Sequence, residues 1–130
     1  MIMLPALIGA ALATATVFFL SRVGVLRSGV VALVLVAMAG FWPLFAVATQ
    51  DDGQIVLHIT LFFCFATAAV LSNRVGIQGL AFTLIAHSIL DAALFTTVHP
   101  GPLWWPVFSA GYGVALGGLL LISFRKGDIA

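Results

Sequence analysis

The chain has 130 residues, of which 63% are hydrophobic and only 7% are charged, and its net charge at pH 7 is +1. Soluble domains carry about 25% charged residues, so this composition excludes an ordinary water-soluble fold and predicts an all-α integral membrane protein. The small net charge offers no basic surface for nucleic acid. The single cysteine, Cys64, can form no disulfide within the chain.

Five apolar segments follow one another along the chain. A transmembrane helix needs about 20 mostly apolar residues to cross about 30 Å of hydrocarbon. The segments that qualify cover residues 4–20, 29–49, 55–71, 77–98 and 103–124, with short polar or Gly/Pro-rich breaks between them. No Lys or Arg precedes the first segment, which favours a retained helix over a signal peptide. We therefore predict one transmembrane helical domain over residues 1–130.

The basic residues indicate the orientation of this predicted bundle. Five spans place all of them on one side, after the first, third and fifth segments: Arg22, Arg27, Arg74, Arg125 and Lys126. Asp51, Asp52 and His99 fall on the other side. The positive-inside rule then predicts an outer N-terminus and a cytoplasmic C-terminus, and we expect the lipid bilayer to be that of a bacterial plasma membrane.

Small residues recur at four-residue spacing in the first and last segments. Small side chains let helix backbones approach closely in a bilayer, where apolar surface alone gives no drive for association. These stripes predict packing faces, either within the chain or between copies in a homo-oligomer. They comprise Ala6, Ala10 and Thr14 in the first segment and Ser109, Gly113 and Gly117 in the last.

Ionisable residues inside the spans are costly and commonly mark function. Asp91 is the only acid within a predicted span, and His87 lies four residues before it on the same helix face. With a rise of 1.5 Å per residue, Asp91 and His87 lie about 10 and 16 Å below the outer end of their segment, and His58 about 5 Å below that of its own. These depths predict a pocket in the outer half of the bundle, open to one side.

The residue types suggest roles within this pocket. Asp91 and His87 form the expected catalytic acid–base pair, unless they serve only to fix their helix by hydrogen bonding. Tyr112, the only tyrosine, needs a partner for its hydroxyl in the membrane and is expected to pair with one of them. The expected substrate-binding residues are His58, Trp42 and Trp105, although Trp104 and Trp105 also suit an aromatic belt at the outer interface.

The sequence leaves several functions open. The favoured one is acid–base chemistry on, or binding of, an apolar or lipid-derived small molecule, as in a membrane-embedded isomerase, cyclase or hydrolase. A metal or haem site built from His87, Asp91 and His58 has little support, because no second helix repeats the pattern; no metal is predicted and the cofactor stays unknown. A proton-coupled transporter or channel acting as a homo-oligomer, and a structural subunit of a larger membrane complex, are the alternatives.

Overall fold

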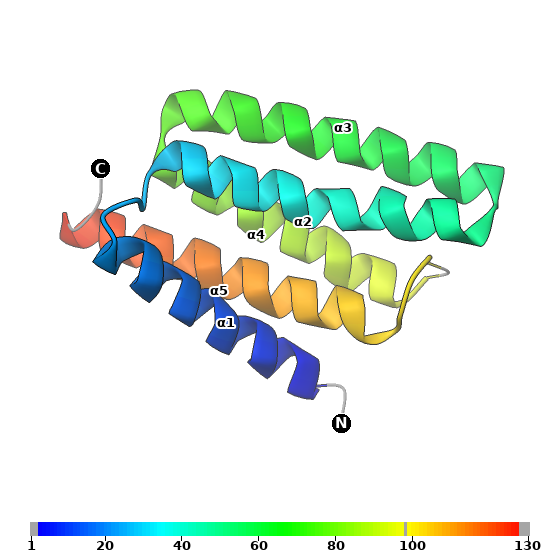
Figure 1. Cartoon of the computed structure of the whole chain (residues 1–130), viewed down its shortest axis with the longest axis horizontal. Coiled ribbons are helices and arrows are strands. Elements are labelled where there is room, and N and C mark those ends of the chain that lie inside the picture. The colour runs from blue at the N-terminus through cyan, green and yellow to red at the C-terminus, as the bar shows by residue number, and fades with distance from the viewer. Residues whose placement is uncertain (1–2, 98, 128–130) are drawn as a thin grey trace.

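The computed structural model describes residues 3–97 and 99–127, and these ranges form an all-helical protein (Figure 1). Five α-helices follow in chain order within them: α1 (Met3–Arg22), α2 (Ser28–Thr49), α3 (Asp52–Val75), α4 (Ile77–Phe95) and α5 (Trp104–Lys126). Each of the five is long and apolar enough to cross a membrane. The predicted all-helical architecture and the predicted number of apolar helices are therefore confirmed for the described part of the chain.

Helix α3 is longer than the predicted span of 55–71, because local capping interactions set its ends. The side chain of Asp51 accepts a hydrogen bond from the Gln54 backbone N–H at 3.1 Å and so caps the helix three residues earlier. At the other end α3 continues through residues 72–74, where a break was predicted. The chain turns only at Gly76, whose φ of 98° suits a residue without a side chain.

The predicted end of the fourth span is also wrong. α4 ends at Phe95, because Thr96 and Thr97 close the last turn with backbone bonds to the carbonyls of Ala93 and Leu94. The predicted terminal residue, Val98, lies outside the described residues.

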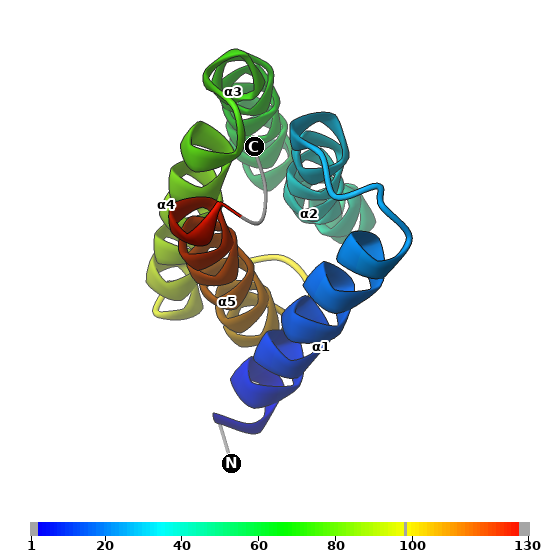
Figure 2. The same ribbon diagram turned by 90° about the vertical axis from the view of Figure 1, so that its left-hand side faces the viewer.

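The helices run alternately up and down. α1 packs along α5, α5 along α4, α4 along α3 and α3 along α2, so α1 and α2 do not pack together although they are consecutive (Figure 2). The α1–α2 and α3–α4 connections lie at one end of the bundle together with the end of α5 (Figure 1). We call this the basic end, because the five basic residues all lie there. The α2–α3 and α4–α5 connections form the opposite end.

Glycines bring α5 close to both of its neighbours. A Cβ atom added to Gly117 would lie 2.7 Å from the Ala81 carbonyl oxygen of α4, and one added to Gly111 would collide with the Ala6 carbonyl of α1. On α1, a Cβ at Gly9 would meet the Tyr112 backbone nitrogen at 2.9 Å. The predicted stripe of α5 is thus buried as a packing face inside the chain, whereas on α1 the close contacts are at Ala6 and Gly9 and the predicted stripe residue Thr14 is exposed.

The outer surface of the bundle is apolar. Leu33 of α2 and Phe63 of α3 are 70% and 62% exposed, and every helix contributes comparable side chains. Contiguous apolar surface of this extent is unusual on a soluble monomer, whereas lipid solvates it well. The buried leucines, in contrast, lie on the inward faces of α2, α4 and α5: Leu35, Leu80, Leu84, Leu116 and Leu120.

Candidate functional site

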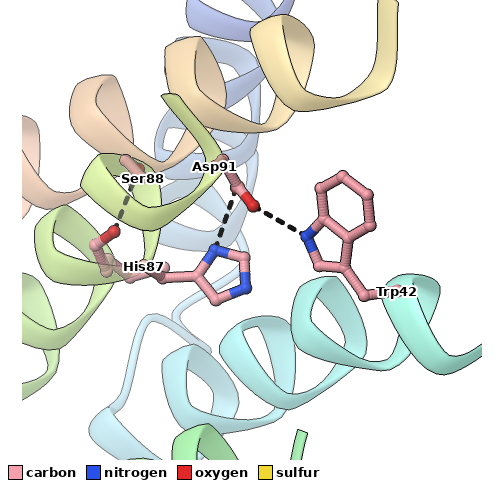
Figure 3. A network of polar contacts seen from close by, with 5 residues as sticks. Trp42, His87, Ser88 and Asp91 are labelled. Carbon is pink, nitrogen blue, oxygen red and sulfur yellow. Dashed lines mark hydrogen bonds and ion pairs between the residues drawn. The ribbon is translucent and has the colours of Figure 1, made fainter. Parts of the chain in front are cut away.

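The polar centre of the bundle is built around Asp91 of α4. Its side chain is fully buried, and the Trp42 indole nitrogen of α2 donates a hydrogen bond of 2.8 Å to its Oδ1 atom (Figure 3). The two residues are 49 positions apart in the chain. This bond therefore ties α2 to α4, which otherwise share little contact.

His87 lies one turn before Asp91 and faces it, as predicted from their spacing. Its Nδ1 atom is 3.0 Å from Asp91 Oδ2, which is an ion-pair distance (Figure 3). The two atoms are nevertheless not aligned for a hydrogen bond, and both are buried without such a partner. The ring of Phe65 on α3 lies edge-on to the imidazole at 4.8 Å and closes this side of the pair.

His58 of α3 joins the same centre through the indole of Trp42. The two rings stack at 5.3 Å with an interplanar angle of 17°. His58 Nε2 lies 3.1 Å from Gln54 Oε1, while its Nδ1 is buried and unpartnered. The ring of His99 lies edge-on to the same indole at 5.7 Å. We call Trp42, His58, His87 and Asp91 the Asp91 cluster.

The observed helix ends change the positions of the cluster residues along their helices. Because α3 begins earlier and α4 ends earlier than predicted, His58 lies about 9 Å from the opposite end of its helix. Asp91 and His87 lie about 6 and 12 Å from that end of α4 by the same rise.

Tyr112 does not belong to the cluster. Its hydroxyl donates to Thr16 Oγ1 of α1 at 3.2 Å. A phenol has a single proton to donate, so this bond contradicts the predicted pairing with His87 or Asp91. Tyr112 instead links α5 to α1.

The two adjacent tryptophans differ in environment. Trp104 is 51% exposed, as an interfacial residue would be, whereas Trp105 is buried at 7%. The ring of Trp105 packs 4.5 Å from Phe41 and 5.6 Å from Phe45, both on α2. The predicted interfacial belt therefore fits Trp104 but not Trp105. The Trp105 indole nitrogen has no hydrogen-bond partner among the described residues.

The charges around the cluster are sparse. The basic residues lie at the far, basic end, so His87 is the partner that can balance an Asp91 carboxylate. Within residues 3–97 and 99–127, no three His, Cys, Asp or Glu side chains converge as metal ligands would. The metal interpretation of His58, His87 and Asp91 thus gains no geometric support.

Comparisons with protein-family models, curated proteins and solved structures found no match for this chain. Two polar residues of this region were not predicted from the sequence as functional. Gln54 was assigned to a loop because the Asp51 cap was not recognised, and Ser109 was interpreted only as a packing residue, although its buried hydroxyl lacks a partner.

Proposed function

We propose that this chain is an integral membrane protein that carries out acid–base chemistry on an apolar or lipid-derived small molecule through Asp91 and His87. The N-terminus is outside, the C-terminus is cytoplasmic and the membrane is a bacterial plasma membrane. The apolar outer surface and the segregation of all five basic residues at one end support this arrangement.

The observation that carries the proposal is the incomplete hydrogen bonding of the Asp91 cluster. His58 Nδ1 has no hydrogen-bond partner, and His87 Nδ1 and Asp91 Oδ2 face each other at 3.0 Å without the alignment of a hydrogen bond. Each unsatisfied buried polar atom costs about 1–3 kcal/mol, so a cluster that served only to fasten helices would be expected to pair them. Incomplete pairing is the condition expected of groups that exchange protons with a substrate.

The two oxygens of Asp91 have different surroundings, which suggests different roles. Oδ1 accepts from Trp42, whose indole nitrogen is a donor only and cannot take up a proton. Oδ2 faces the His87 imidazole at 3.0 Å, within reach for sharing a proton. The pair can therefore remove a proton from a C–H group next to a carbonyl of the substrate, where the carbonyl takes up the electron pair as an enolate, and return the proton at another carbon, as in an isomerisation.

Deuterium exchange tests this proposal. The purified protein is reconstituted into vesicles of total lipid extract from a bacterial plasma membrane, in D2O, and the lipids are analysed by mass spectrometry. Proton abstraction and return should place deuterium in one lipid species with the wild-type protein. The Asp91→Asn variant should lose this exchange, because an amide keeps the acceptor for Trp42 but cannot carry the proton.

Asp52→Asn is the matched control, since Asp52 is an exposed acid in the first turn of α3. It should retain full exchange. Thermal unfolding of both variants in detergent checks that each is folded. Exchange that persists in Asp91→Asn, or its absence from the wild-type protein, would contradict the proposal.

A further inference from the structure

A groove lies between α1, α2 and α5, beside the Asp91 cluster. Its volume is about 290 Å³. It exists because α1 packs along α5 and not along α2, which leaves the faces of these three helices incompletely filled (Figure 2). We call it the lateral groove. Its lining includes Leu12, Phe41, Trp105, Ser109 and Tyr112.

The lining is apolar apart from three polar side chains, all on α5. Tyr112 has already committed its proton to Thr16. Trp105 and Ser109 are four residues apart and so share one helix face. Both are buried, and the Trp105 Nε1 and Ser109 Oγ atoms have no hydrogen-bond partner among the described residues. Two residues that line an otherwise apolar groove thus each carry a buried donor without an acceptor.

We propose that the lateral groove binds a lipid-soluble molecule through a carbonyl oxygen that accepts hydrogen bonds from Trp105 and Ser109. A carbonyl oxygen has two lone pairs and can accept from both donors. The groove is at the small end of the usual range for ligand sites, about 300–1,000 Å³. It therefore suits a ring system or a single chain segment rather than a whole phospholipid.

The ligand reaches the groove from the bilayer. Leu12 of α1 and Phe41 of α2 lie at its rim and are 50% and 40% exposed. Because α1 and α2 do not pack together, the opening between them faces the surrounding lipid. A molecule dissolved in the membrane can enter there without crossing water.

This inference rests on the proposed function in one respect, namely that the groove holds the substrate of Asp91. The Phe45 ring lies between the groove and the Asp91 cluster, since its centroid is 5.6 Å from the ring centroid of Trp105 and 6.4 Å from that of Trp42. Trp42 in turn bonds Asp91. Trp105 of the groove is consequently connected to Trp42 of the Asp91 cluster by ring contacts through Phe45.

Photolabelling with benzophenone, an apolar aromatic ketone, tests the site. The full chain in lipid vesicles is irradiated with the probe, and the labelled residues are mapped by mass spectrometry. Labelling is expected on groove residues such as Leu12 and Met38. Fluorenone, a ketone, should compete at least about tenfold better than fluorene, the hydrocarbon of the same shape, because about tenfold is the ratio that one of the two proposed hydrogen bonds gives alone.

Two variants and one control sharpen the result. The double variant Trp105→Phe, Ser109→Ala removes both donors and keeps the apolar walls, so fluorenone and fluorene should then compete equally. Trp104→Phe changes the exposed neighbour and should leave the tenfold difference intact. Ala37→Leu, which adds bulk from the α2 side of the groove without touching the donors, should abolish the labelling.

The outcomes separate this proposal from the acid–base proposal. Asp91→Asn should keep the labelling and lose the deuterium exchange. Labelling confined to the groove without any exchange that depends on Asp91 would support the binding site and reject the chemistry. Labelling spread over the lipid-facing helix surfaces, or a fluorenone preference that survives in the double variant, would overturn the inference.

Discussion

At the scale of single residues, Trp42 determines how the candidate site is held. Its nitrogen bonds Asp91 on α4 and its ring stacks on His58 of α3. One side chain of α2 thus positions an acid and an imidazole from two other helices. Since an indole can donate but not accept, it keeps Oδ1 of Asp91 occupied and leaves Oδ2 toward His87.

Trp42→Phe is expected to destabilise the protein by about 1–3 kcal/mol, because a buried carboxylate oxygen would lose its donor while the aromatic packing stays. Chemical unfolding in detergent micelles measures this change. Trp104→Phe, at an exposed position, serves as the reference and should alter the unfolding free energy little. Equal effects of the two substitutions would show that the bond to Asp91 contributes nothing to stability.

The sequence places Asp91, His87 and His58 in the same half of the bundle, and in the structure Asp91 faces His87 directly and is linked to His58 through Trp42. It does not reveal the Trp42–Asp91 bond, because contact between helices depends on how each helix is rotated about its axis, which the packing of the whole bundle decides. The partner of Tyr112 was not predictable from the sequence for the same reason. Its need for a partner was evident from its depth, but α1 rather than α4 supplies that partner.

At the scale of helices, hydropathy locates the spans but not their ends. The Asp51 cap and the Gly76 turn extend α3 beyond its apolar segment at both ends, and each depends on a single residue. A window of mean hydropathy is insensitive to such residues. The small-residue stripes were more informative, because close approach of two helices directly requires residues without bulky side chains.

The α4–α5 contact provides a matched pair of substitutions. Gly117→Ala should destabilise by about 1–3 kcal/mol, because the new methyl group would press on the Ala81 carbonyl and on Ile85. Gly118→Ala adds the same group where nothing lies within 4 Å, and should stabilise the helix by about 0.5–1 kcal/mol. Thermal unfolding of the two variants gives the comparison. A similar loss from both would mean that backbone flexibility, not close packing, explains these glycines.

At the scale of the whole molecule, charge is strongly segregated. The described acids Asp51 and Asp52 lie at the opposite end, Asp91 lies in that half of the bundle, and the basic side chains flank the helices only at the basic end. The alternation of the helices seen in Figure 1 brings together there residues from two connections and from the end of α5.

The proposed orientation can be measured by cysteine accessibility. With Cys64 replaced by Ser, a cysteine introduced at the exposed Asp52 should react with a membrane-impermeant maleimide in intact cells. A cysteine introduced at the exposed Asn73 near the basic end should react only after the membrane is permeabilised. The reverse pattern would invert the proposed topology.

The attachment of α1 has a mechanical consequence. Residues 23–27 connect α1 to α2 at the basic end, and the distance between the two helices increases away from this connection (Figure 1). Because α1 spans 20 residues, about 30 Å, a tilt of about 5° displaces its far end by about 2.6 Å. Transmembrane helices adjust their tilt to the thickness of the bilayer. Because α1 packs closely on α5 at Ala6 and Gly9, the two helices would tilt together in a membrane, and their tilt relative to α2 would set the width of the lateral groove.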